Sequence, residues 1–73
     1  DEVIDYKTKL QEKLQEKGPC NILYELVSAD GPVHHCLFEM QVVANGKILG
    51  KGSAYSKKEA QQKAACDAFS KIG

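Results

Sequence analysis

The sequence predicts an α+β domain in which a three-stranded antiparallel sheet carries both helices on one face. Apolar residues recur every three or four positions near the amino terminus and again near the carboxyl terminus, as on one side of an amphipathic helix. Between these stretches apolar and polar residues alternate, and an Asn-Gly pair interrupts them, as in strands joined by a hairpin. Because each helix has one apolar side to bury, both are expected on the same face of the sheet.

The first helix is expected over residues 3–17. Its apolar positions, at steps of three and four, are Val3, Tyr6, Leu10 and Leu14. The Gly18-Pro19 pair ends the helix, because glycine adopts the left-handed conformation that follows a helix and proline cannot continue one.

Three strands are expected next, over residues 22–27, 36–44 and 47–52. The first is rich in branched and aromatic residues, and the second alternates with the period of two that a half-buried strand shows. The Ala-Asp-Gly-Pro stretch at residues 29–32 has the composition of a turn between them. Asn45-Gly46 predicts a two-residue type I′ turn, which needs positive φ at both positions, so the third strand returns beside the second.

The second helix is expected to start at Ser56 and to run to the carboxyl end. Ser56 and Glu59 have the spacing of a capping box, in which the serine hydroxyl accepts from a free amide and the glutamate reaches back to the Ser56 amide. Most apolar positions of this helix are alanine, which allows its backbone to lie close to the sheet. These positions are Ala60, Ala64, Ala65, Ala68, Phe69 and Ile72.

The composition fits one small domain, residues 1–73, and excludes a two-domain enzyme for this chain. Ten lysines, no arginine and ten acidic residues give a formal net charge of zero, so a nucleic-acid partner has to be inferred from where the charges lie. No apolar run exceeds three residues, so no membrane segment is expected. Three distant cysteines without a Cys-x-x-Cys pair argue against a disulfide framework and a zinc site, and favour a reducing, cytoplasmic location.

Two groups of polar residues have no role in the predicted core. The first group shares the side of the first helix opposite its leucines and consists of Thr8, Gln11, Glu12 and Gln15. Such side chains can bond ribose 2′-hydroxyls and base edges in the shallow minor groove of A-form RNA, although a solvated helix face has the same pattern. The second group is a rigid loop that can enter a minor groove or form a plain surface turn. It consists of Gly31, Pro32, Val33, His34 and His35.

The third group is a run of lysines without an acidic residue among them. These lysines are Lys47, Lys51, Lys57 and Lys58. Lys57 and Lys58 fall in the first turn of the second helix, where the helix dipole disfavours cations. A phosphate bound at that end would offset the cost, whereas a solvated charge run is the alternative. The lack of arginine argues against reading of the DNA major groove, and the few aromatic residues argue against a platform for single-stranded bases.

In their order along the chain, these residues resemble a double-stranded RNA-binding domain. The matching motifs are Gly31-Pro32-x-His34, Phe38, Gly50-x-Gly52, Ser56-Lys57-Lys58-x-Ala60 and Ala64-Ala65-x-x-Ala68-Phe69. The opening of the chain is similar to the start of the carboxyl-terminal RNA-binding domain of bacterial ribonuclease III. It reads Asp5-Tyr6-Lys7-Thr8-x-Leu10-Gln11-Glu12. The resemblance covers nearly the whole chain.

The resemblance implies three contact regions on double-stranded RNA. The first helix would lie in one minor groove through Thr8, Gln11, Glu12 and Gln15, and the loop of Gly31, Pro32, Val33 and His34 in the next. Lys57 and Lys58 would contact phosphates across the intervening major groove. Gln61 stands where the family usually has a third basic residue, and is expected to donate a neutral hydrogen bond to phosphate, with Lys63 as a substitute cation. Ser53-Ala54-Tyr55 replaces a glycine common before the helix.

The resemblance also implies that the chain is a domain excised from a longer protein. The parent would be ribonuclease III, a homodimer that cuts duplex RNA with magnesium held in its nuclease domain. This segment would have no catalytic site, no metal site and no cofactor, and would be a monomer alone. A protein-interaction domain is the alternative, with Leu37 or Val43 exposed on the open sheet face. A stand-alone enzyme is disfavoured, because Glu12, Glu59 and the two histidines form no convincing catalytic pair.

Overall fold

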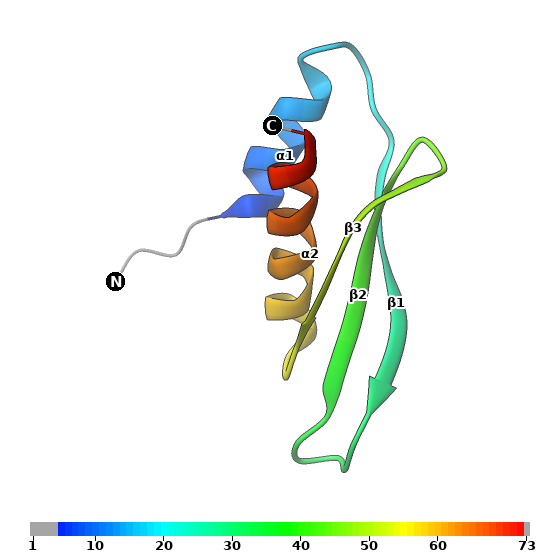
Figure 1. Cartoon of the computed structure of the whole chain (residues 1–73), viewed down its shortest axis with the longest axis vertical. Coiled ribbons are helices and arrows are strands. Elements are labelled where there is room, and N and C mark those ends of the chain that lie inside the picture. Colours follow the sequence, from blue (N-terminus) through cyan, green and yellow to red (C-terminus); the bar gives the residue numbers. More distant parts are fainter. Residues whose placement is uncertain (1–4, 73) are drawn as a thin grey trace.

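The computed structural model describes residues 5–72, and its elements follow the predicted order. They are α1 (Tyr6–Gln15), β1 (Ile22–Asp30), β2 (Leu37–Ala44), β3 (Lys47–Ala54) and α2 (Lys57–Ile72). The strands form one antiparallel sheet in the order β1-β2-β3. Both helices lie side by side on one face of this sheet, and β1 lies on the far side from them (Figure 1). The predicted α+β architecture is therefore confirmed.

Helix α1 is shorter than expected at its carboxyl end. Asp5 caps its start, where the carboxylate accepts a hydrogen bond of 3.3 Å from the Thr8 amide. The chain leaves the helix after Gln15, whose carbonyl accepts from the Gly18 amide at 3.1 Å, and Gly18 has a φ of 123°. The glycine therefore ends the helix as predicted, one turn after its last helical residue. Val3 lies outside the described residues.

Strand β1 continues three residues beyond its predicted end. The pairing with β2 shifts between Leu26 and Ser28, which is a β-bulge, and resumes with Ala29 opposite Phe38. The pairing continues past the bulge, so Ala29 and Asp30, the first half of the stretch expected to form a turn, belong to the strand. The prediction of a turn from residue 29 was wrong, and the loop starts at residue 31.

The two remaining signals from turn and cap chemistry hold. Asn45 and Gly46 have φ values of 52° and 83°, so the type I′ turn between β2 and β3 is confirmed. The Ser56 hydroxyl accepts from the Glu59 amide at 3.1 Å, as in a capping box. The Glu59 carboxylate accepts from that same hydroxyl at 3.3 Å, instead of the Ser56 amide that was expected. Strand β3 reaches Ala54, two residues further than predicted.

The core lies between α2 and the sheet, and its close packing depends on small residues. The residues with no exposed surface in the larger cluster are Leu10, Val42, Ala64, Ala65 and Ala68. A second cluster contains Met40, Ala54 and Ala60. A Cβ atom on Gly50 would lie 2.5 Å from the Ala68 amide nitrogen, so only glycine fits there. The alanines therefore bring the helix backbone against β3, as their spacing predicted.

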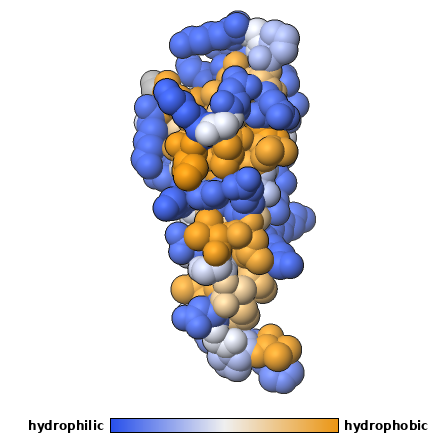
Figure 2. All heavy atoms as spheres, turned by 90° about the vertical axis from the view of Figure 1, so that its right-hand side faces the viewer, coloured by the Kyte–Doolittle hydropathy of each residue, from blue (hydrophilic) through white to orange (hydrophobic). Residues whose placement is uncertain are grey.

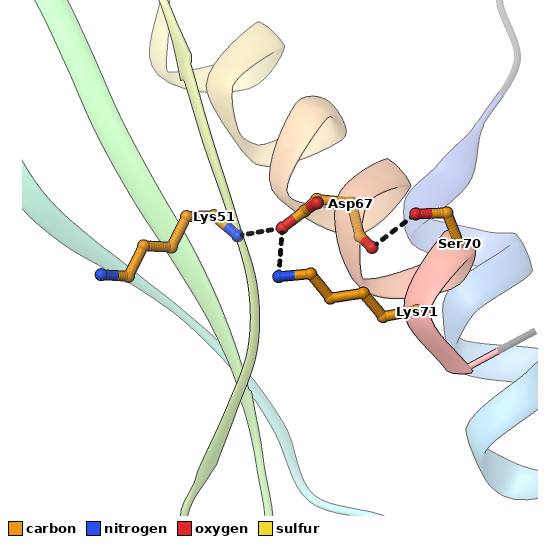
Figure 3. Close-up of polar contacts among 4 residues, drawn as sticks. All are labelled: Lys51, Asp67, Ser70 and Lys71. Carbon is orange, nitrogen blue, oxygen red and sulfur yellow. Dashed lines mark hydrogen bonds and ion pairs between the residues drawn. The ribbon is translucent and has the colours of Figure 1, made fainter.

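One carboxylate of α2 bonds the backbone of β3. The Asp67 carboxylate accepts from the Lys51 amide at 3.1 Å and from the Lys71 ammonium at 3.0 Å (Figure 3). The Ser70 hydroxyl bonds the Asp67 carbonyl at 2.9 Å. The bond from the Lys51 amide, followed by the one from Lys71, holds the pKa of Asp67 below its ordinary value. An outward-pointing amide of β3 is thus occupied by the helix.

The open face of the sheet carries exposed apolar residues in separate groups, divided by a hydrophilic band (Figure 2). Leu37 is 39% exposed, as expected. The prediction that Val43 is exposed was wrong, because Val43 pairs with Leu23 and Ile48 and is only 8% exposed. Its two neighbours on the adjacent strands are about half exposed and form the apolar surface instead.

Candidate nucleic-acid interface

The α1 surface consists of the four predicted side chains Thr8, Gln11, Glu12 and Gln15, all of which are exposed. Leu10 is fully buried and fixes which side of the helix faces the core. The Thr8 hydroxyl donates to the Asp5 carboxylate at 2.7 Å. This bond, followed by one from Gln62, lowers the pKa of Asp5 from 3.8 to about 2. Because the hydroxyl proton is engaged, Thr8 presents its lone pairs and acts as an acceptor toward a ligand.

The β1–β2 loop is a closed turn with an exposed tip. The His35 amide donates to the Pro32 carbonyl at 2.9 Å, so Val33 and His34 occupy the tip. Gly31 has a φ of 112°, and a Cβ atom there would lie 2.7 Å from the His35 carbonyl oxygen, so the loop closes only with glycine. All four predicted loop residues, from Gly31 to His34, are exposed.

A ring stack links this loop to the segment before α2. The His35 ring lies on the Tyr55 ring with a centroid distance of 4.2 Å and an interplanar angle of 25°. Tyr55 directly precedes Ser56, the residue that caps α2. The stack therefore ties the position of the loop tip to the amino-terminal end of the helix. The sequence reasoning placed His35 in the loop but missed this contact, since nothing local relates it to Tyr55.

Lys57 and Lys58 are exposed in the first turn of α2. The Lys57 ammonium lies 5.6 Å from the Phe38 ring centroid, a cation–π contact that holds the group in place without neutralising its charge. Within residues 5–72 the single recorded salt bridge joins Lys71 to Asp67, so both ammonium groups are unpaired. Two unpaired cations and a helix amino terminus together form a local positive field that suits phosphate.

Gln61 lies one turn further along α2 and is half-buried. Its Oε1 accepts a hydrogen bond of 2.7 Å from the ammonium of Lys7 in α1. Lys7 was not among the predicted site residues, because a contact between residues 54 apart leaves no periodic signal in the sequence. Lys63, the suggested substitute cation, lies against Gly52 of β3, on the other side of α2 from Gln61.

The three surfaces follow one another along the molecule. The described chain measures 41 Å along its longest axis, and Figure 1 shows α1, then the start of α2, then the β1–β2 loop in order down this axis. The two lysines thus lie between the α1 surface and the loop.

Residues 5–72 contain no group of three His, Cys, Asp or Glu side chains arranged to hold a metal ion. No helix within the same range is long and apolar enough to cross a membrane. The three cysteines are free and only partly buried.

Comparison with known proteins gives matches along nearly the whole chain. The family model described as "Double-stranded RNA binding motif" matches residues 6–72. A ribonuclease 3 of Streptococcus gordonii is 52% identical over 71 residues, which are 97% of this chain and 31% of that protein. A ribonuclease 3 of Clostridium botulinum is 50% identical over 70 residues, 96% of this chain and 30% of that protein. The chain thus spans about a third of the length of the curated relatives it matches.

Proposed function

The chain belongs to the double-stranded RNA binding motif family, and from this we propose that it binds A-form RNA duplexes by their shape, through 2′-hydroxyl and phosphate contacts. The observation that carries the proposal is the pair of unpaired cations, Lys57 and Lys58, between two exposed polar surfaces. Domains of this kind contact two successive minor grooves and the phosphates between them, over about 16 base pairs.

Each surface has a role in this proposal. The α1 surface (Thr8, Gln11, Glu12 and Gln15) meets one minor groove, where its amides donate and its oxygens accept from ribose hydroxyls. The loop of Gly31, Pro32, Val33 and His34 meets the next minor groove. Lys57 and Lys58 neutralise phosphates across the major groove and release counterions, which makes binding depend on salt. Gln61 lies one turn beyond the lysines on the same side.

The test is a competition between RNA and DNA duplexes of the same sequence and length. Because contacts to 2′-hydroxyls and to the wide, shallow minor groove exist only for RNA, the RNA duplex is expected to displace the DNA duplex at equal concentration. A chain with equal affinity for the two duplexes would bind by charge alone, and the proposal would be abandoned.

The whole protein is proposed to be a bacterial ribonuclease III, with this chain as its carboxyl-terminal, substrate-binding domain. The relatives named above carry the name ribonuclease 3 and are about 50% identical to this chain. In this proposal magnesium and the cutting carboxylates belong to the nuclease domain of a cytoplasmic homodimer, and the isolated domain is a monomer. The sequence preceding Asp1 in the full gene product tests it, since it must contain a cluster of acidic metal ligands.

Protein interaction through the open sheet face is the second candidate function. The half-exposed Leu23 and Ile48 on either side of Val43 favour it. Sedimentation of the chain without RNA distinguishes the two functions. A mass that rises with concentration, and that a Leu23→Ser variant loses, would support interaction between copies through this face.

A further inference from the structure

The row of cations on α2 is interrupted after one turn. Lys57 and Lys58 are exposed. Gln61 lies four residues after Lys57 and three after Lys58, and this spacing places it on the same side of the helix. Its amide carries no charge. A phosphate backbone that continues along this side of α2 would therefore pass two positive residues and then meet a neutral one.

An ammonium group from α1 fills this position in space. The Lys7 Nζ atom lies 2.7 Å from Gln61 Oε1 and 4.9 Å from the centroid of the Tyr24 ring. The backbone of this turn is also fixed, because the amides of Tyr6 and Lys7 both donate to the side chain of Gln62, at 2.9 and 3.3 Å. The position of the Lys7 charge is thus determined by contacts to α2 and to β1.

The Lys7 ammonium retains the capacity to bind an anion. It has three N–H donors, of which one is used by Gln61. The Tyr24 ring attracts the charge without neutralising it. The salt bridge recorded within residues 5–72 does not involve Lys7, and its side chain is only partly buried. Two donors and a full positive charge therefore remain for a phosphate oxygen.

We propose that Lys7 is a third phosphate-binding cation of the interface, contributed by α1 and held beside Lys57 and Lys58 by Gln61 and Tyr24. This inference rests on the RNA-binding function proposed above. It changes the role expected for Gln61, whose carbonyl oxygen is occupied by Lys7. Gln61 becomes a positioning residue that fixes the ammonium, and its own NH₂ group is a secondary donor.

Three variants test the proposal, with a synthetic RNA duplex of about 20 base pairs as the probe, long enough for a domain that spans about 16. Lys7→Gln removes the charge and keeps an amide beside Gln61. The exchange variant Lys7→Gln with Gln61→Lys places the ammonium on α2 and the amide on α1. Lys51→Gln is the matched control, because its side chain points away from α2 across the strands (Figure 3) and only its backbone bonds Asp67.

The measurement is the slope of log affinity against log salt concentration. This slope is negative, and each phosphate contact adds about 0.9 to its magnitude. Lys7→Gln is therefore expected to reduce the magnitude of the slope by about 0.9. Lys51→Gln is expected to leave the slope unchanged, and the exchange variant is expected to restore it. Thermal unfolding of each variant tests whether the chain is folded. If Lys7→Gln is unfolded, Lys7→Met replaces it, because methionine keeps an apolar stem against the Tyr24 ring.

Two results would overturn the proposal while leaving the RNA-binding function intact. One is a Lys7→Gln chain that binds the duplex with the slope of the parent chain. The other is an exchange variant whose slope stays as shallow as that of Lys7→Gln, because a cation at this place would then not account for the lost dependence on salt. Failure of the parent chain to prefer RNA over DNA would instead overturn the proposed function, and this inference with it.

Discussion

Replacing Lys57 and Lys58 together by alanine is expected to weaken duplex RNA binding by an amount that depends on salt. Both side chains are exposed and neither belongs to the recorded salt bridge, so each ammonium is available to one phosphate. Loss of two contacts reduces the magnitude of the negative slope of log affinity against log salt by about 1.8. A fourfold rise in salt, from about 50 to about 200 mM, then narrows the difference in affinity between parent and variant by about tenfold.

Fluorescence anisotropy with a labelled RNA duplex at four or five salt concentrations measures this slope directly. Lys57 also contacts the Phe38 ring, so alanine removes packing as well as charge. The double methionine variant keeps both stems and is the control for that loss. Lys47→Ala with Lys51→Ala removes the same charge from β3 and is expected to leave the slope near that of the parent. Parallel lines for the parent and the Lys57/Lys58 variant would refute the phosphate role of this pair.

Two further outcomes follow from individual contacts. Because Asp5 has a pKa of about 2 in the folded chain, against an ordinary 3.8, its ionised form stabilises the fold above pH 3.8, and this contribution disappears as the pH falls through 2. The unfolding temperature of Asp5→Ala, followed by circular dichroism, should therefore approach that of the parent in acid, and a constant gap would contradict this. Tyr55→Leu removes a ring stack worth about 0.5–1.5 kcal/mol, so the loop loses its fixed position and duplex affinity falls by about two- to tenfold. Unchanged affinity in Tyr55→Leu would show that the stack with His35 has no bearing on binding.

Local chemistry was sufficient to predict most of the fold. The Asn45-Gly46 turn, the cap at Ser56 and the alanine side of α2 each depend on residues close together in the sequence, and each is present. The length of β1 was not predictable in the same way. The bulge between Leu26 and Ser28 is a property of the pairing with β2, and neither strand alone contains a signal for it.

The same distinction between local and distant contacts applies to the candidate interface. Periodicity and cap spacing were enough to select side chains that are exposed on α1, in the loop and at the start of α2. Contacts between elements were not visible. The bond from Lys7 to Gln61 and the stack of His35 on Tyr55 join segments that meet only in the folded chain. Val43 was misjudged for this reason too, since its neighbours on β1 and β3 cover it.

The bond between Asp67 and the Lys51 amide has a consequence for self-association. A free strand edge is a template for further strands, and here the carboxylate already takes an amide that an incoming strand would need. Strand β1 forms the other edge of the sheet (Figure 1). Two copies that joined β1 to β1 would present β3 at both outer margins. A further strand that approached β3 would then have to displace Asp67 from the Lys51 amide before it could pair there.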